Sequence, residues 1–524
     1  MARVASEPAC ASNDGLMKMM NMMRRYKAFR LAVTLTVLSL MIWLGAGPGS
    51  LAWAFGLSEE KVLGRKIVGQ IREHFPLVED GELVAYVQSV GNRIAKEFDS
   101  SLYQYQIFII NSSVPNAFAI PGGYIFIYRG IIDMMDNEGE LAGIISHEMA
   151  HVQARHIAHR IEDSRILNIA TIAGVLAAVF LGGGGNASAA MAMGTLAGAQ
   201  TLQLQYSREN EEEADRFGFA YYCAAGYDPR DMVAIMENIS RARFQPDSRM
   251  PSYLSSHPLL GERIHYLRMM TEKERKPSDK SLQRQPQGDF LLMKAALISD
   301  YEDPHVARER LQSMARQKDL EMAATYGLGR LDLRQNQAGE ALEKFRQLAV
   351  QRPNSPMILS SMGAAYFQQG RLEEARKVLS TALLLDSNAV NVHYRLAMVL
   401  RDMGQTDEAL QHLRKAEQMA PMMPEIDYQL GVLLGQKNDL GMAHYYLGSY
   451  YRQRKDVKPA IFHYEKAKNL LTASPARKAE VEEALRELKG EKARQEQEKS
   501  EKDKVRKPMP FGAGMGPQLL PVAH

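Results

Sequence analysis

Two short segments of the sequence carry side chains that could bind a metal ion. The first is HEMAH at residues 147–151, an HExxH pattern. On a helix its two histidines, four residues apart, lie on one face, so their imidazoles can hold one zinc ion while Glu148 handles the proton of the attacking water. Residues 207–215 are strongly acidic and offer a distant carboxylate as a third ligand. Together the two segments indicate a zinc peptidase.

HExxH is a short pattern that also arises by chance, so both histidines could be ordinary, partly buried side chains. Three features favour the metal site. The apolar spacing of residues 139–152 predicts an amphipathic helix that would present both histidines from a fixed wall. The acidic segment also has helical spacing and places Glu211 and Asp215 four residues apart, and a Ser-His-Pro turn containing His257 follows further on.

The elements that must position these residues lie in a module predicted for residues 55–274. A β-rich run at 103–110 predicts a strand, and residues 116–128 predict a strand, a tight Pro-Gly-Gly turn and a second strand. An exposed edge strand can pair with an extended substrate and hold its scissile amide at the metal. We favour residues 116–119 for this edge, although a purely structural hairpin explains the pattern equally well.

Several motifs together resemble the HtpX-like/CaaX-prenyl-protease family of zinc metallopeptidases, which are gluzincins. The motifs are HExxH, the acidic helix, Asn116-Ala117-Phe118-Ala119 with its glycine turn, and Ser256-His257-Pro258 with Glu262-Arg263-Ile264. The likeness covers nearly all of the chain after residue 54, because the repeats described below belong to it too.

The resemblance implies one Zn2+ ion per chain, with His147, His151 and Glu211 as its ligands. Glu148 would be the general base of peptide hydrolysis. Asp215 would accept a hydrogen bond from a ligand imidazole and fix its orientation. A purely structural zinc site is the alternative, but such a site has no use for the glutamate within HExxH.

Within the acidic segment, only Glu211 shares a helix face with Asp215 and Gly218, and the glycine would let a neighbouring helix approach. Glu213 is expected to face solvent. His156 lies off the metal-binding face, so we interpret it as a surface or structural residue.

The resemblance also implies that His257 is a fourth ligand able to occupy the position of the catalytic water. Such a ligand would keep the protease latent until a substrate or partner moved the loop. The alternative is that His257 donates a hydrogen bond to the transition state. Asn116, Ala117 and Phe118 are the candidate substrate-binding residues.

Residues 1–54 predict a cleaved export signal and therefore a periplasmic protein. Basic residues precede an apolar run at 31–46, and Ala52-Trp53-Ala54 is typical of a cleavage site. The alternative is an anchor in the inner membrane formed by an uncleaved 31–54. The net charge is +3, but residues 1–54 hold six basic and two acidic residues, so the rest of the chain carries −1. Nothing in this balance indicates a nucleic-acid partner.

Residues 166–199 combine a mostly apolar run with four consecutive glycines and a stretch of small residues. The apolar run is shorter than a membrane span. We predict a mobile lid that covers the cleft or makes peripheral contact with a membrane, and a buried core helix is the alternative.

A regular sequence repeat occupies the second half of the chain. One column is small (Gly329, Gly363, Ala397, Gly431), a second is alanine throughout (Ala341, Ala375, Ala409, Ala443), and a third is large and apolar (Phe345, Leu379, Leu413, Leu447). This column pattern and its constant period are the tetratricopeptide signature. The period then slips, since Gly448 follows Gly431 after only half a repeat, so one helix is expected to serve two units. We predict a linker at 275–288, the repeats at 289–487 and a charged disordered tail at 488–524, for which a frayed helix is the alternative.

The predicted fold is thus an α+β metallopeptidase domain, mostly helical with a small β-sheet, followed by an all-α tetratricopeptide-repeat solenoid. The predicted function is zinc-dependent endopeptidase activity, with possible chaperone activity, in envelope quality control. The resemblance implies that misassembled outer-membrane β-barrel proteins are the substrates and that their assembly machinery is a partner. The alternative is a repeat scaffold or chaperone whose zinc site is largely latent.

Overall fold

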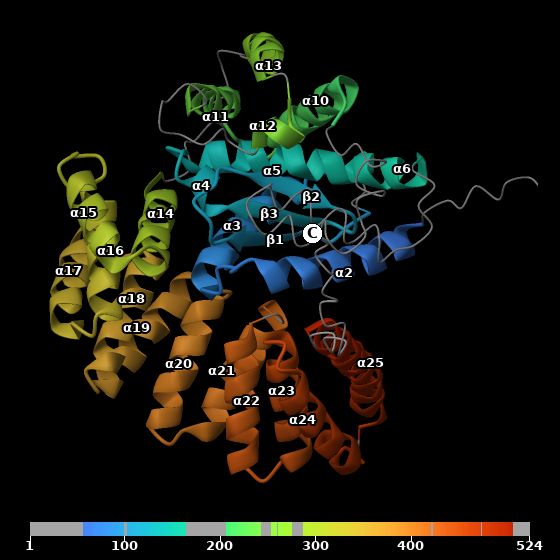
Figure 1. Ribbon diagram of the computed structural model, residues 1–524. Helices are drawn as coiled ribbons and strands as arrows, with labels where there is room; N and C mark the ends of the chain where they lie inside the picture. The colour runs from blue at the N-terminus through green and yellow to red at the C-terminus, as the bar shows by residue number, and fades with distance from the viewer. Residues whose placement is uncertain are drawn as a thin grey trace, which may run out of the picture.

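The computed structural model describes residues 56–98, 102–163, 206–242, 253–258, 260–274, 287–420, 423–472 and 474–506. The predicted export signal and the predicted lid lie outside these residues, as does nearly all of the linker. The described part is a mostly helical domain around a small sheet, followed by an array of helices that curves beneath it (Figure 1). This arrangement confirms the predicted fold class.

The sheet has three strands, β1 (Gln106–Ile110), β2 (Ala117–Ile120) and β3 (Tyr124–Tyr128), in the order β1-β3-β2. β3 pairs with β1 in parallel and with β2 in antiparallel register. The predicted hairpin is therefore present, and Gly122 and Gly123 of its turn have φ values of +93° and +91°, which favour glycine. The first strand begins at residue 106 rather than at the predicted 103.

The two faces of the sheet bury alternate side chains against different helices, because successive strand residues point to opposite sides. Five helices lie in this part of the domain: α2 (Leu57–His74), α3 (Gly81–Ala95), α4 (Arg129–Ile132), α5 (Glu138–Gln153) and α6 (His156–Asp163). Ile107, Ile125 and Ile127 pack with α3 and α5. Phe118 and Phe126 pack with α2 and α6 on the other face.

A second layer of helices covers α5 on the side away from the sheet (Figure 1). It consists of α10 (Arg208–Ala224), α11 (Pro229–Ala242), α12 (Tyr253–Ser256) and α13 (Leu260–Glu274). A Cβ atom on Gly218 of α10 would lie 3.1 Å from the backbone oxygen of Ser146 and 3.2 Å from the Cα atom of His147. The predicted close approach at Gly218 is confirmed, and it brings the acidic helix against the HExxH helix.

The second half of the described chain is a run of antiparallel helices. They are α14 (Gln287–Tyr301), α15 (Pro304–Met314), α16 (Glu321–Arg334), α17 (Ala338–Gln351), α18 (Pro356–Gln368), α19 (Leu372–Leu385), α20 (Val390–Asp402), α21 (Thr406–Met419), α22 (Pro424–Gln436), α23 (Leu440–Gln453), α24 (Val457–Leu470) and α25 (Pro475–Arg506). α25 continues to Arg506, so residues 488–506 of the predicted tail follow its helical alternative, in which charged residues of high helix propensity extend the last helix.

The repeat columns make the contacts that their spacing predicts. A Cβ atom on Gly363 would lie 2.6 Å from Leu379, and one on Gly431 would lie 2.7 Å from Leu447, so each small residue faces the large residue of the third column. The structure also explains the slip in period. α23 packs against both α22 and α24, and Gly448 faces Tyr464 in the same way. One helix therefore serves two units, as predicted.

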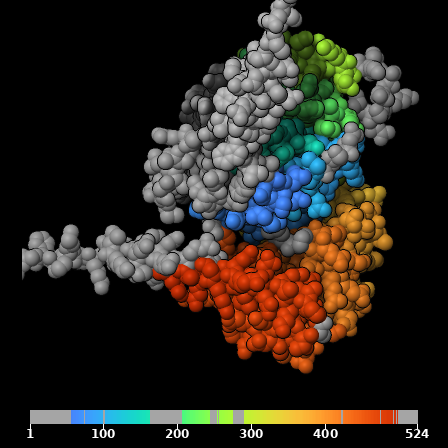
Figure 2. All heavy atoms as spheres, turned by 90° about the vertical axis from the view of Figure 1, so that its right-hand side faces the viewer, coloured from blue at the N-terminus to red at the C-terminus, as the bar shows by residue number. Residues whose placement is uncertain are grey.

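The repeat array packs against the first domain through buried charges. Arg330 of α16 is 6% exposed and lies 2.7 Å from Asp80, 3.0 Å from Glu82 and 2.6 Å from Asp300. Figure 2 shows α2, in blue, above the repeats in orange and red. Lys455 of the array donates to the backbone oxygen of Gly69 in α2. Among the described residues, none of the helices combines the length and the apolar character that a membrane crossing requires.

Candidate metal centre

Four side chains from three segments meet in the layer between α5 and α10. His147 and His151 project from α5, Glu211 from the first turn of α10, and His257 follows α12. One ligand atom of each lies within 4.8 Å of the ligand atoms of the others, and all four residues are buried. The structure therefore brings together the three predicted metal ligands and the predicted fourth one.

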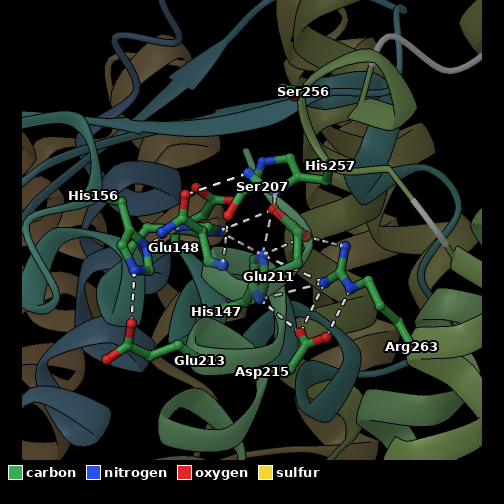
Figure 3. Close-up of polar contacts among 12 residues, drawn as sticks. His147, Glu148, His156, Ser207, Glu211, Glu213, Asp215, Ser256, His257 and Arg263 are labelled. Atoms are coloured by element: carbon green, nitrogen blue, oxygen red, sulfur yellow. Dashed lines mark hydrogen bonds and ion pairs between the residues drawn. The ribbon is translucent and has the colours of Figure 1, made fainter. Parts of the chain in front are cut away.

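The contacts within this group are short and leave the ring nitrogens facing one another (Figure 3). The Nε2 atoms of His147 and His151 are 3.0 Å apart, and Nδ1 of His257 is 3.3 Å from Nε2 of His147. Glu211 reaches Nε2 of His151 at 3.4 Å and Nδ1 of His257 at 2.9 Å. Imidazole and carboxylate ligands around one point are the donor set that zinc prefers.

The general-base candidate, Glu148, is fully buried beside this group. Its Oε1 atom lies 3.4 Å from Nε2 of His257. Within the described part of the chain, both carboxylate oxygens of Glu148 and Nε2 of His257 lack a hydrogen-bond partner. Buried polar atoms rarely lack a hydrogen-bond partner. Here such atoms surround one point, which fits a bound cation and its water.

The protonation states of His151 and Glu211 suit metal binding. Burial lowers the pKa of His151 well below its ordinary value, so its imidazole is neutral. Burial alone would raise the pKa of Glu211, but the Arg263 guanidinium and His257 hold it well below the ordinary value. A neutral imidazole and an ionised carboxylate are the forms that coordinate a metal. Burial raises the pKa of Glu148, which brings this carboxyl closer to the range of an effective base.

Asp215 lies where the sequence placed it, one turn after Glu211 on the same face of α10. Its Oδ1 atom is 2.8 Å from Nδ1 of His147, so it accepts a hydrogen bond from the nitrogen that points away from the cluster. This contact fixes the ring and directs Nε2 inward. Tyr266 of α13 also donates to Asp215.

Arg263 of α13 was given no role by the sequence, although it stands in the segment that the family resemblance included. It is 2% exposed and lies 2.6 Å from Glu211 and 2.7 Å from Asp215. The guanidinium thus holds both acidic residues at once, as Figure 3 shows. Burial opposes its charge, but the two carboxylates raise the pKa of Arg263 well above its ordinary value.

A second histidine contact was also missed. His156 is 4% exposed, and its Nδ1 atom lies 2.8 Å from Nδ1 of His151. The other nitrogen of His156 lies 3.2 Å from Glu213, which is exposed, as expected, and also reaches this ring. His156 is structural, as predicted, but it orients His151 in the way that Asp215 orients His147. The spacing of His151 and His156 in the sequence did not predict this contact, because it depends on the turn between α5 and α6.

Of the substrate-binding candidates, Ala117 and Phe118 lie on β2, at one edge of the sheet, and Asn116 directly precedes this strand. Asn116, Ala117 and Phe118 are all buried, and the ring of Phe118 stacks on Phe126. The backbone nitrogen of Tyr253 in α12 donates to the carbonyl oxygen of Pro115, two residues before β2 begins. The position of β2 at the edge of the sheet agrees with the prediction. The three side chains are part of the core, so only the backbone of this segment could bind a substrate.

Sequence comparisons agree with this architecture. Residues 83–271 match the profile of Peptidase family M48, and residues 300–356 and 355–422 match tetratricopeptide-repeat profiles. The beta-barrel assembly-enhancing protease of Escherichia coli (strain K12) is 28% identical over 376 residues, which cover 64% of this chain and 75% of that protein. Its namesake from Yersinia pestis is 26% identical, covering 77% of this chain and 88% of that protein.

A shorter match is to a eukaryotic protein. The mitochondrial metalloendopeptidase OMA1 of Schizosaccharomyces pombe is 32% identical over 179 residues, which cover 34% of this chain and 50% of that protein. The M48 profile spans the buried histidine and glutamate cluster. The chain therefore carries a metallopeptidase domain that belongs to family M48, followed by tetratricopeptide repeats.

Proposed function

We propose that this protein is an exported zinc-dependent endopeptidase that degrades misassembled outer-membrane β-barrel proteins and promotes their assembly. One observation carries the enzymatic part of the proposal. His147, His151 and Glu211 converge with His257 in one buried group, and the carboxylate of Glu148 is beside it without a hydrogen-bond partner among the described residues.

His147, His151 and Glu211 would hold the zinc ion, with Asp215, Arg263 and His156 fixing their orientation. Zinc bound there would supply Lewis acidity toward water and the peptide carbonyl. Glu148 would take the proton of the attacking water at its carboxylate and return it to the leaving amine. Its raised pKa suits both transfers, because the carboxylate gains and then loses a proton within one cycle.

His257 would act as a switch that keeps the site latent. Its contacts with Glu148 and Glu211 place it between the base and a ligand. α12 ties it to the substrate edge, since Tyr253 bonds to the carbonyl of Pro115. A substrate strand that added to β2 would compete for this carbonyl and so loosen the loop that carries His257.

A His257→Ala variant tests the switch. Higher peptidase activity with unchanged metal content is the expected result, because the competing ligand is gone. Loss of activity at the same metal content would instead identify His257 as a donor to the transition state.

The substrate and location in this proposal rest on the relatives and on the sequence. The bacterial relatives are named beta-barrel assembly-enhancing proteases. The repeats offer a surface for recruiting unfolded proteins or assembly partners. The basic and apolar pattern of residues 1–54 supports export to the periplasm.

The decisive experiment compares the wild-type chain with Glu148→Gln. Metal content is measured on both, and both are given an unfolded outer-membrane barrel protein and a folded control. Wild type should contain one zinc ion per chain and degrade the unfolded protein, while the variant should keep its zinc and lose roughly 10²–10⁴-fold in rate.

A second readout separates the enzyme from a scaffold. Both proteins are supplied to cells that lack the native gene, and barrel assembly is scored. Equal, slow degradation by both proteins together with equal rescue would support a repeat scaffold with an idle metal site. Absence of any bound metal would overturn the enzymatic proposal.

A further inference from the structure

Four histidines outside the catalytic cluster form two pairs in the repeat array. Nδ1 of His393 in α20 lies 2.8 Å from Nδ1 of His412 in α21. Nδ1 of His444 in α23 lies 2.9 Å from Nδ1 of His463 in α24. Each pair joins two neighbouring antiparallel helices, and the two members of each pair are equally far apart in the sequence.

The two pairs occupy equivalent positions in two helix pairs of the array, and we call this pair of positions the slot. His444 follows His393 at the same distance in the sequence as His463 follows His412. That distance is one full repeat plus the half repeat of the slip, so the helix pair α23/α24 repeats the geometry of α20/α21. In α18/α19 the slot holds Leu359 and Val378, which are apolar. Helix packing alone therefore does not require histidine in this slot.

The ring nitrogens of the first pair are prepared to act as ligands. Nε2 of His393 donates to the carbonyl oxygen of Ser387 at 3.0 Å, which leaves a lone pair on Nδ1. A hydrogen bond from the outer nitrogen to a carbonyl is the contact that metal-bound histidines usually make. Burial lowers the pKa of His393 and lowers the pKa of His412 to about 4, so both rings are neutral at neutral pH.

The second pair is similar. Burial lowers the pKa of both His444 and His463. The ring of Tyr451 stacks on His463 with centroids 5.3 Å apart, which holds that imidazole in place. Neutral, positioned imidazoles lose less entropy on binding a cation than free ones do.

The choice of metal follows from the ligand type. The two Nδ1 atoms of each pair are 2.8 and 2.9 Å apart, close enough for both to reach one ion. Imidazole suits copper, nickel and zinc, and nitrogen sites generally bind copper most tightly among divalent first-row ions.

We propose that each histidine pair is a chelating site for one divalent transition-metal ion, with Cu2+ preferred, bound through the two Nδ1 atoms and completed by water. The ion would clamp α20 to α21 in one site and α23 to α24 in the other. Lys415 near the first pair and Lys466 near the second oppose the added charge, while Asp386 favours it near His393. Both sites should therefore be weaker than the four-residue catalytic cluster.

The test uses the full-length, zinc-loaded protein titrated with Cu2+. Binding is followed by calorimetry, the copper environment by electron paramagnetic resonance, and zinc content by elemental analysis, so that displacement from the catalytic cluster is seen separately. Wild type should take up two further Cu2+ ions per chain, each with two equatorial nitrogens and no loss of zinc.

Two double variants copy the residues that the array itself carries in the equivalent slot. His393→Leu with His412→Val should remove one copper site, and His444→Leu with His463→Val the other. Single changes of His412→Asn and His463→Asn give a second set if a double variant melts early. His305→Gln is the control, because this exposed histidine lies outside both pairs and its loss should leave two sites.

The outcomes decide the proposal. Copper uptake that does not fall by one ion per altered pair would overturn it, since the rings would then share only an internal hydrogen bond. Uptake of Zn2+ at the pairs as tight as that of Cu2+ would overturn the choice of metal, because nitrogen sites should bind copper more tightly than zinc.

Discussion

The M48 domain and the repeat array differ in the contacts that hold their helices together. In the M48 domain, Glu211, Asp215 and Arg263 are buried charges that depend on one another across distant segments. In the array, a glycine faces a large residue on the next helix, and the same contact recurs along the chain. Replacing one buried charge of the M48 domain should therefore lower the free energy of unfolding strongly and disturb the other charges of its network. Replacing one glycine of the array should have a smaller effect that stays within its own repeat.

The largest effect should follow from Arg263→Met. The change leaves two buried carboxylates without their cation, which should lower the free energy of unfolding by about 3–5 kcal/mol and weaken metal binding. Urea unfolding and zinc titration measure both effects. Arg268→Met is the matched control on the same helix, because its ion pair with Glu237 is exposed and should contribute about 0–1 kcal/mol. Similar losses in both variants would contradict this picture.

Arg330→Met tests whether the two regions unfold together. Arg330 is buried between them and contacts Asp80 and Glu82 of the M48 domain. Its loss should cost roughly 3 kcal/mol and split a single calorimetric transition into two. The control is Arg346→Met, since that side chain is exposed within the array. A single transition in both variants would show that the domains are coupled by other contacts.

Within the array, Gly431→Ala and Gly435→Ala form a matched pair on α22. A Cβ atom at Gly431 would lie 2.7 Å from Leu447, so the change should destabilise the array by about 1–3 kcal/mol. At Gly435 the nearest atom is 3.8 Å away, and alanine should stabilise the helix by about 0.5–1 kcal/mol. Thermal melting of both variants gives the sign. Equal shifts would mean that the small column has no packing role.

The last expected effect is a pH dependence from Asp427 in α22. Burial raises the pKa of this carboxyl to about 7, whereas an unfolded aspartate has a pKa near 3.8. Between these values the unfolded chain loses the proton and the folded chain keeps it. Stability should therefore fall as pH rises from about 4 to 7 and then level off.

Asp427→Asn removes this titration. Melting temperatures measured across the same pH range should decline less steeply in the variant than in wild type. Parallel curves for the two proteins would show that Asp427 ionises in the folded state at its ordinary pKa.

Several features could be read from the sequence because they depend on local periodicity. HExxH on a helix places His147 and His151 on one face, and the glycine turn closes the hairpin before β3. The repeat columns predicted both the helix pairs and the shared helix α23, since each contact lies within one repeat length of the chain. The family resemblance carried Glu211 and His257 to positions that the structure brings together.

The remaining features were decided only by the tertiary structure, because they join segments whose separation no periodicity fixes. The turn between α5 and α6 brings His156 to His151, and the packing of α13 on α10 brings Arg263 to two carboxylates at once. Whether a buried charge is tolerated depends on partners in three dimensions rather than on its own neighbours in the chain. The sequence was thus sufficient to predict the candidate metal ligands. The residues that orient these ligands could be identified only from the packing of the helices.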